Sequence, residues 1–308
     1  MQSFTLATVK TEATYEPVIC VSDRSFYLRS LLDLPLPLRS KATVKDLLDS
    51  WHDSFSLLVE LAERLVRYPQ SYSQDAVLAA SVAFETPIRF PNKLLCVGAN
   101  YASHLREMGV APEKMTPMPF FSRPPTTSLV GPGRTVRKPR STSQLDWEVE
   151  LVIVVGKCLR HATSLDEASS AIAGFSVGLD LSCRDLQMVK DLGMDVSRGK
   201  AQDTLAPVGP VFVPKEFIQE DFHDLGIKLF VNGEKMMDAR TNEMLYSLEE
   251  QLLEISKYTT LEPGDLVFTG APAGSAKAHG QRWLQVGDKI RAEIEGVGVL
   301  DVEVTEDD

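Results

Sequence analysis

The sequence predicts an α+β protein, with a small N-terminal α/β domain over residues 1–85 and a sheet-rich body over residues 86–308 that forms a mixed β-roll or barrel-like structure. Three observations support this prediction. The first 70 residues contain a strand-like hairpin and one amphipathic helix. The segment 70–87 is polar and mixed, as expected of a domain boundary. From Ile88 onward, short runs rich in β-branched residues alternate with Gly and Pro turns, which is typical of a sheet with few helices.

The N-terminal domain is predicted from local patterns. Residues 16–32 have the pattern of a hairpin, with its turn near Ser22. Thr43 and Asp46 form a capping-box pattern at the start of a helix, with Asp in place of the usual Glu. That helix has apolar residues at spacings of three and four, which indicates one buried stripe, and it ends near Tyr68. The stripe comprises Leu47, Trp51, Phe55, Leu58, Ala62 and Leu65.

The body is predicted run by run. Asn232-Gly233 is a strong hairpin signal between two strand-like runs. Helical stretches are expected near 102–108, 164–172, 182–192 and 246–258. The strand-like runs are KLLCVG, EVELVIVVG, AGFSVGLDL, PVGPVFVP, IKLFVNGE, DLVFTG and DKIRAEIEGVGVLDVEV.

Composition narrows the class of protein. The chain has 308 residues and a formal charge of −11 at neutral pH, so a nucleic-acid or anionic-membrane partner, which would need a basic surface, is not expected. No apolar run approaches the roughly 18 residues that span a bilayer, and the N-terminus lacks the pattern of a secretory signal. The four cysteines form no C-x-x-C pair, which predicts reduced thiols and a cytoplasmic protein.

Two glutamates precede the most apolar run of the chain. Glu148 and Glu150 are two positions apart, so in a strand their side chains point the same way, away from Trp147, Val149 and Leu151. Such a pair is usually the solvated face of a half-buried strand. Here the strand becomes apolar at once, so the two carboxylates lie at the entrance of a core, where they repel each other unless a cation neutralises them.

Asp180 is a single carboxylate within the apolar run AGFSVGLDLS. It either caps a helix that begins near Ser182 or supplies a third oxygen ligand. Three carboxylates without His or Cys suit Mg²⁺ or Mn²⁺, with Ca²⁺ as a further option, and do not suit zinc. Such a ligand set leaves coordination positions open for water and substrate.

His104 and Glu107 lie three apart at the start of a predicted helix, so they face the same side of it. A carboxylate next to an imidazole orients the ring and raises its basicity, as a water-activating base requires. An ordinary surface pair is the alternative interpretation. Lys200 is similarly either a positioned cation or a surface residue.

A strand runs into a Gly-rich turn over Phe268–Gly274. Exposed backbone N–H groups in such a turn could hold a carboxylate, which makes Thr269, Gly270 and Ala271 candidates for substrate binding. A purely structural turn is the alternative.

Taken in order, NYASHLREM, DWEVELVIVVGK, GLDLSCRDLQ, SRGKAQDTLAPVGP, VNGE and DLVFTGAPAG resemble the catalytic domain of the fumarylacetoacetate hydrolase family over roughly residues 88–305. The resemblance implies a homodimer that acts on a small dicarbonyl or oxo-acid substrate with Mg²⁺ or Mn²⁺. One departure is Ala271, where relatives often have Thr. The missing hydroxyl predicts weaker binding of a substrate carboxylate, or a substrate with an apolar or ketone group there. The implied site residues are Glu148, Glu150 and Asp180 for the metal, His104, Glu107 and Lys200 for catalysis, and Arg184 and Gln187 for the substrate.

Members of this family cleave, decarboxylate, hydrate or isomerise such compounds. The resemblance therefore predicts a hydrolase that cleaves a C–C bond in a 1,3-diketo acid, an acylpyruvate or a related β-dicarbonyl compound, with His104 and Glu107 activating water and Lys200 stabilising the oxyanion. Hydrolysis is preferred because both members of the water-activating pair are present. The alternative is a decarboxylase, or a keto–enol isomerase or hydratase, that acts on a 2-oxo or β-keto acid through an enolate. A non-catalytic binding module with the same fold is a further alternative.

Overall fold

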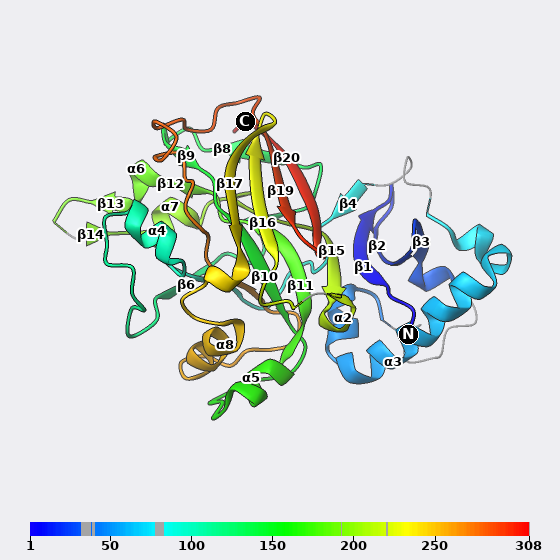
Figure 1. Cartoon of the computed structure of the whole chain (residues 1–308). Coiled ribbons are helices and arrows are strands. Elements are labelled where there is room, and N and C mark those ends of the chain that lie inside the picture. Colours follow the sequence, from blue (N-terminus) through cyan, green and yellow to red (C-terminus); the bar gives the residue numbers. More distant parts are fainter. Residues whose placement is uncertain (32–37, 39–40, 78–82, 192, 220, 308) are drawn as a thin grey trace.

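The computed structural model describes residues 1–31, 38, 41–77, 83–191, 193–219 and 221–307. Its described strands form several sheets, none of them a closed barrel, and helices pack around them (Figure 1). The predicted α+β class is confirmed. None of the described helices is both long and apolar enough to cross a membrane.

The larger sheet joins the two predicted domains. Its main path has the order β3-β2-β1-β15-β11-β10-β18-β5-β6, with β4 beside β1 and β7 beside β15. The junction is the antiparallel pair β1 and β15, where Leu6 lies opposite Phe212. The strands are β1 (Thr5–Lys10), β2 (Tyr15–Val21), β3 (Arg24–Tyr27), β4 (Ala83–Glu85), β5 (Leu94–Val97), β6 (Phe120–Arg123), β7 (Leu129–Val130), β10 (Val149–Val155), β11 (Ile172–Leu179), β15 (Ala206–Pro214) and β18 (Leu266–Phe268).

A second sheet packs across the first. It has the order β17-β16-β19-β20-β8, and the predicted Asn232-Gly233 turn joins β16 to β17. The strands are β8 (Thr135–Lys138), β16 (Gly226–Val231), β17 (Glu234–Arg240), β19 (Lys289–Ile294) and β20 (Gly298–Glu306). Two small antiparallel pairs complete the described strands: β9 (Leu145–Asp146) with β12 (Ser182–Cys183), and β13 (Met188–Val189) with β14 (Gly193–Met194).

Strand β10 separates two apolar cores. Val149, Leu151 and Ile153 contribute to the core toward the second sheet. Val152 and Val154 contribute to the core toward the N-terminal helices. Successive residues of a strand point to opposite faces, so this alternation also sets the direction of Glu148, just before β10, and of Glu150 within it.

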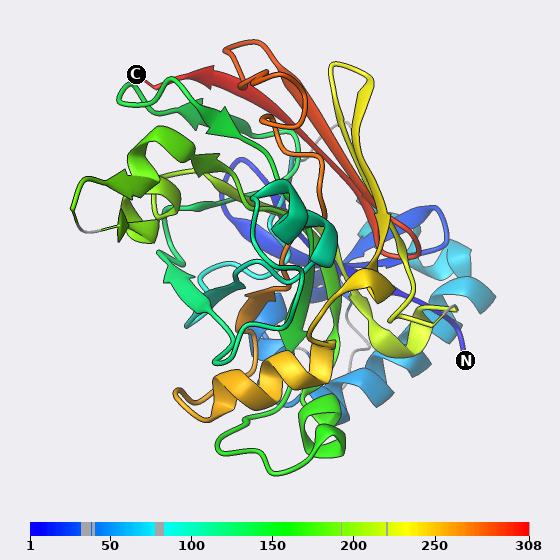
Figure 2. The ribbon, with the colours of Figure 1, turned by 60° about the vertical axis from the view of Figure 1, so that its left-hand side comes forward.

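Seven α-helices are described, most of them short. Helices α5 and α8 pack together at one end of the body, α8 in gold and α5 in green (Figure 2). The helices are α2 (Val44–Leu48), α3 (Trp51–Arg67), α4 (Ala102–Glu107), α5 (Leu165–Ser170), α6 (Arg184–Gln187), α7 (Val196–Lys200) and α8 (Leu248–Ser256).

Two predicted helices need correction, and a third helix was missed. The single helix after Thr43 is two helices, because the chain leaves helical geometry at Ser50, a residue type whose hydroxyl competes for backbone hydrogen bonds. The capping box at Thr43 and Asp46 is confirmed. The helix expected over 182–192 is only the short α6, followed by the β13–β14 hairpin. Helix α7, which was not predicted, begins at Val196 after the N-cap Asp195, whose side chain accepts from the Arg198 amide.

The division at residues 85 and 86 stays a proposal. The N-terminal strands share a sheet with the body, and one apolar core runs from Leu6 and Leu58 to Leu94 and Phe268. The predicted N-terminal hairpin is confirmed as β2 and β3, with its turn at Ser22.

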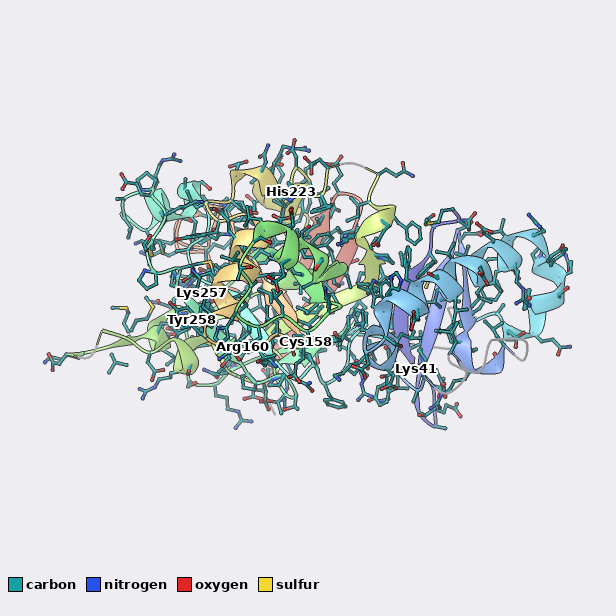
Figure 3. All side chains as sticks on the ribbon, turned by 90° about the horizontal axis from the view of Figure 1, so that it is seen from below. Lys41, Cys158, Arg160, His223, Lys257 and Tyr258 are labelled. Carbon is teal, nitrogen blue, oxygen red and sulfur yellow. The ribbon has the colours of Figure 1, made fainter. Side chains whose placement is uncertain are left out.

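The loop before β16 is joined to α8 through His223, labelled in Figure 3. One ring nitrogen lies 2.8 Å from Asp221 Oδ1 and the other 2.9 Å from Glu249 Oε1. Burial lowers the pKa of His223, but the hydrogen bonds to Glu249 and Asp221 outweigh burial and raise the pKa above its ordinary value.

We expect the stability contributed by His223 to fade at alkaline pH. Because the folded-state pKa lies above the unfolded-state pKa of about 6.5, the contribution of His223 to stability is complete below the unfolded-state pKa. That contribution is lost as pH rises through the folded-state pKa. His223→Gln should therefore lower the free energy of unfolding more at about pH 5.5 than at about pH 9. Urea unfolding of both proteins at the two pH values measures this difference. Equal losses at both would contradict the assignment.

Candidate metal and active site

Three buried carboxylates meet where β10 begins and β11 ends. Glu148, Glu150 and Asp180 each offer an oxygen, and these oxygens all lie within 4.8 Å of one another. The antiparallel register brings them together, because Glu150 lies opposite Gly178 and the Asp180 amide donates to the Glu148 carbonyl oxygen at 2.9 Å. The shared direction of the two glutamates agrees with the strand periodicity, but they are buried and do not form a solvated face.

The two glutamates have opposite electrostatic surroundings. Burial and the nearby carboxylates Asp180 and Glu148 hold the pKa of Glu150 well above its usual value. Burial alone would also raise the pKa of Glu148, but the charges of Arg184 and Lys200 outweigh burial and lower it. Glu150 is therefore the ligand whose charge the protein compensates least.

Three cations surround these carboxylates. Lys200 Nζ donates to Glu148 Oε2 at 2.8 Å and also to Asp180. Arg184 donates to Glu148 Oε1 at 2.5 Å and to Asp146 Oδ2 at 2.8 Å. The alternative of a surface Lys200 is therefore wrong. The alternative that Asp180 caps a helix is also wrong, since its carboxylate contacts Lys200 and Arg123.

The donor set fits a hard divalent cation. The ligands are all carboxylates, which Mg²⁺ and Mn²⁺ prefer. With every carboxylate ionised, five acidic groups oppose three permanent cations at the site, so two negative charges remain, as many as one divalent ion neutralises. The acidic groups are Glu107, Asp146, Glu148, Glu150 and Asp180, and the cations are Arg123, Arg184 and Lys200.

The predicted His–Glu pair lies beside this cluster. His104 Nδ1 is 3.1 Å from Glu107 Oε2, and His104 Nε2 is 3.5 Å from Glu148 Oε1. The ring is 7% exposed, so the alternative of an ordinary surface pair is wrong. One nitrogen is thus oriented by Glu107 while the other faces the metal ligands.

Glu107 is held by a loop far away in the sequence. Ser275 donates to Glu107 Oε1 through its hydroxyl at 2.7 Å and through its amide at 3.1 Å. Burial raises the pKa of Glu107, but the hydrogen bonds from His104 and Ser275 outweigh it and lower the pKa. The pair is therefore kept as a carboxylate next to an imidazole.

We expect Ser275→Ala to lower kcat by on the order of tenfold, because a hydrogen bond to a charged group is worth about 1.5–3 kcal/mol and the amides of Gly274 and of residue 275 still donate to Glu107. With one donor removed, the pKa of Glu107 should rise, so the acidic limb of the kcat/KM profile should move to higher pH. Steady-state kinetics across pH measures both effects. An unchanged acidic limb would contradict this positioning role, and Ser275→Thr should restore the wild-type profile.

The Gly-rich turn after β18 is engaged with the protein itself. The Thr269 hydroxyl donates to the Leu151 carbonyl oxygen at 2.9 Å, and the Gly270 amide donates to Glu150 Oε2 at 2.6 Å. Gly270 has φ +90°, and a Cβ there would lie 2.7 Å from the Asn100 Cβ, so this position requires glycine. Ala271 is 3% exposed and packs in the core toward the second sheet. The turn therefore positions the Glu150 carboxylate, a candidate metal ligand, and this role was not part of the prediction of a carboxylate-binding turn.

Arg184 and Gln187 both lie on α6, as expected from their spacing. Gln187 is buried and packs against Gly199, where an added Cβ would meet its Cγ at 2.0 Å. This close approach brings α7, and with it Lys200, next to α6. Arg184 contacts acidic side chains of the protein, so its predicted contact with substrate stays a prediction.

Three residues of the site were missed in the sequence. Arg123 at the end of β6 is fully buried and donates to Asp180 and to the Lys200 carbonyl oxygen. Asp146 accepts from Arg184 and from the Ala276 amide. Ser275 holds Glu107. An arginine at the end of the run FFSRP was a usable signal, since an isolated charge in an apolar strand needs a partner.

A buried carboxylate cluster with an oriented imidazole beside it is the arrangement of a metal-dependent enzyme site. The chain belongs to the fumarylacetoacetate hydrolase family, because the family model described as Fumarylacetoacetate (FAA) hydrolase C-terminal matches residues 93–305. The resemblance drawn from the motifs is confirmed.

Three similar proteins illustrate the range of the family. A mitochondrial oxaloacetate tautomerase of Bos taurus is 38% identical over 222 residues, which cover 72% of this chain and 69% of the relative. The structure of fumarylpyruvate hydrolase from Pseudomonas aeruginosa in complex with Mn²⁺ and pyruvate is 33% identical, with a TM-score of 0.64, and covers 73% of this chain and 92% of that chain. The structure of 2-hydroxyhepta-2,4-diene-1,7-dioate isomerase from Mycobacterium marinum is 25% identical, with a TM-score of 0.71, and covers 99% of both chains. Members of the family are enzymes whose reactions include hydrolysis, isomerisation and tautomerisation.

Proposed function

We propose that this protein is a divalent-metal-dependent enzyme that moves a proton at the carbon beside the carbonyl group of a small 2-oxo acid, and so interconverts its keto and enol forms. The observation that carries this proposal is the placement of His104, between Glu107 at 3.1 Å and the proposed metal ligand Glu148 at 3.5 Å. A base in that position can take a proton from a substrate held at the metal. The similarity to an oxaloacetate tautomerase supports this choice of reaction.

Mg²⁺ or Mn²⁺, held by Glu148, Glu150 and Asp180, would polarise the carbonyl group and stabilise the negative charge that develops on its oxygen. His104 Nε2 accepts the proton from the carbon beside the carbonyl group and returns it to the carbonyl oxygen, or moves it in the reverse direction. Glu107 keeps the ring oriented and stabilises it while it is protonated. Lys200, which already contacts two of the carboxylates, adds positive charge where the anion develops.

C–C hydrolysis of an acylpyruvate or 1,3-diketo acid, the reaction preferred from the sequence, is the second candidate. The complete His104–Glu107 pair favours it, because the same base can deprotonate a water. The similarity to fumarylpyruvate hydrolase supports it as well. In that reaction Lys200 would stabilise the oxyanion at the attacked carbonyl group.

A substrate panel separates the two reactions. Mg²⁺-loaded and Mn²⁺-loaded protein is given the enol form of oxaloacetate, keto-oxaloacetate and an acylpyruvate, and products are followed by NMR. The first proposal expects accelerated enol-to-keto conversion without loss of carbon. Pyruvate and carbon dioxide would indicate decarboxylation, and pyruvate with a carboxylic acid would indicate hydrolysis. No acceleration of any of these reactions would favour a binding module.

Substrate contacts are proposed for Arg184, Gln187 and the turn Thr269–Ala271. The Ala271 methyl group offers no hydrogen bond, so we propose that a substrate carboxylate is held mainly by the charges of Arg184 and Lys200.

We also expect a two-fold symmetric homodimer, as in the family resemblance. Light scattering should give about twice the 34.0 kDa mass of the chain. A mass equal to one chain at working concentrations would contradict this expectation.

We also propose a cytoplasmic location, as the sequence predicts. The Bos taurus relative is mitochondrial by name, so the location of this protein needs its own test. Fractionation of cells that express the full-length protein tests it.

A further inference from the structure

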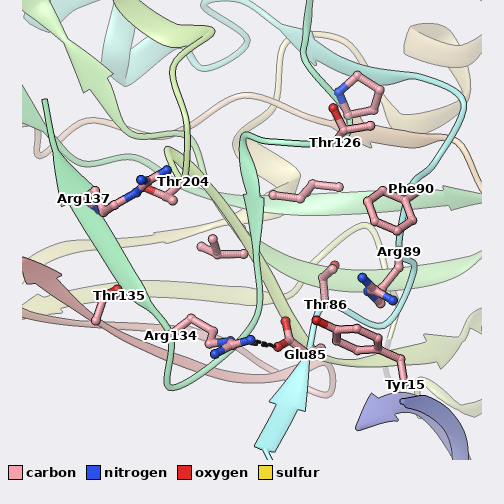
Figure 4. Close-up of a pocket in the computed structure, with 13 residues that line it drawn as sticks. Tyr15, Glu85, Thr86, Arg89, Phe90, Thr126, Arg134, Thr135, Arg137 and Thr204 are labelled. Carbon is pink, nitrogen blue, oxygen red and sulfur yellow. Dashed lines mark hydrogen bonds and ion pairs between the residues drawn. The ribbon is translucent and has the colours of Figure 1, made fainter. Parts of the chain in front are cut away.

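A cavity lined by none of the residues of the metal cluster lies between the N-terminal strands and the body. Its volume is about 340 Å³, which is in the range of small-molecule sites. Tyr15 at the start of β2 forms one wall with Arg89, and Arg137 on β8 lies on the opposite side (Figure 4). Arg134 and its partner Glu85 lie between them (Figure 4). None of these residues belongs to the metal cluster.

The wall of this cavity carries positive charge on a chain whose net charge is −11. Three arginines, Arg89, Arg134 and Arg137, and one acid, Glu85, line it. Arg134 Nε donates to Glu85 Oε1 at 2.8 Å. Among the residues that the structure describes, the acids that Arg137 contacts are Asp203 at 3.2 Å and Asp307 at 3.8 Å, both exposed, and contacts of that kind are weak.

Arg89 has no acidic partner among the residues that the structure describes. Its guanidinium carbon lies 3.3 Å from the centre of the Tyr15 ring and 4.6 Å from that of Phe90. Stacking on an aromatic face fixes the guanidinium plane and leaves its N–H edge available to an acceptor in that plane. A fixed guanidinium without a carboxylate is a donor fork that matches a carboxylate or a phosphate.

Backbone strain marks the same cavity. Phe90 has φ 54° and Thr204 has φ 65°, and both line the wall. A β-branched or bulky residue with positive φ is rare and strained, and such residues gather at ligand sites. Thr204 is held there by two contacts, since its amide donates to the Thr127 carbonyl oxygen at 2.9 Å and its hydroxyl accepts from the Arg137 amide at 2.8 Å.

We propose that this cavity binds a small polyanion, either a dicarboxylate or a phosphate. Arg89 donates to the anion through its free N–H edge, and Arg137 donates to it from the opposite side. Hydroxyl groups of Thr86, Thr126 and Thr135, which also line the cavity, complete a polar wall. The site is separate from the metal cluster, so a ligand there is an effector or a structural anion and not the substrate.

Isothermal titration of the full-length, Mg²⁺-loaded protein with succinate and, separately, with inorganic phosphate tests the proposal. We expect saturable binding of one of them, and the arm that saturates identifies the source of the anion. Arg89→Gln should raise Kd about tenfold, which corresponds to one charge-assisted hydrogen bond. Tyr15→Leu should raise Kd as well without changing the net charge, because the stacking surface is lost.

Arg160→Gln is the matched control, since Arg160 is exposed, lies outside the cavity and carries the same charge (Figure 3). Its Kd should stay within about twofold of the wild-type value. Equal weakening by Arg160→Gln would show non-specific attraction and overturn the proposal. Unchanged affinity of both Arg89→Gln and Tyr15→Leu would place the anion at the metal cluster instead. Absence of saturation with either anion would also reject the site.

Discussion

Replacing His104 by Ala should lower kcat by on the order of 10²–10⁴, which is the range of general acid–base catalysis. The ring is the group that joins Glu107 to the metal cluster, with 3.1 Å on one side and 3.5 Å on the other. Metal affinity should change little, because His104 is not a proposed ligand. Steady-state kinetics on the substrate identified by the panel, with metal binding measured by calorimetry, separates the two effects.

Glu107 acts only through the ring, so the double variant with Glu107→Ala should be hardly slower than His104→Ala alone. His52→Ala is the control, since His52 is exposed on α3 and far from the cluster in sequence. Near-wild-type turnover of His104→Ala would reject its role as the base. Multiplicative losses in the double variant would show that Glu107 has a separate function.

The second large effect is expected at the two glutamates, with different results in the metal-free protein. Glu150→Gln should lower the free energy of unfolding of the metal-free protein by less than about 1 kcal/mol, because the raised pKa of Glu150 means that its neutral form already suits the site. Glu148→Gln should lower the same free energy by about 3–5 kcal/mol, because Arg184 and Lys200 then stay buried without the carboxylate that they both contact. Urea unfolding in EDTA compares the two variants.

With Mg²⁺ or Mn²⁺ added, only the wild-type protein should gain a higher Tm, because binding favours the folded state and both variants lose a charged ligand. Activity should disappear in EDTA and return with either ion. The raised pKa of Glu150 also sets how stability depends on pH. The free energy of unfolding of the metal-free protein should fall as pH rises through the folded-state pKa of Glu150, and bound metal should remove that loss. Full activity in excess chelator, or a metal-induced Tm shift retained by Glu150→Gln, would reject the metal site.

The site depends on contacts of two kinds. The pairing of Glu148 with Glu150 and of His104 with Glu107 rests on the periods of a strand and a helix, so each pair could be predicted from spacing alone. The contact between the two pairs, in which His104 Nε2 lies 3.5 Å from Glu148 Oε1, depends on tertiary packing. It brings together segments more than 40 residues apart, and family resemblance was the only sequence signal for it.

Sequence alone determined the α+β class, the strand runs named for the body, the capping box at Thr43 and the shared direction of Glu148 and Glu150, because these depend on neighbours within one or two turns of the chain. Only the tertiary structure decided which charges surround the carboxylates. Arg123 and Ser275 reach the site from β6 and from the loop after β18, and a buried charge accepts whatever partner the packing supplies. The cavity at Arg89 likewise exists only because β1 pairs with β15 and brings the N-terminal strands against the body, a non-local pairing that no local period specifies.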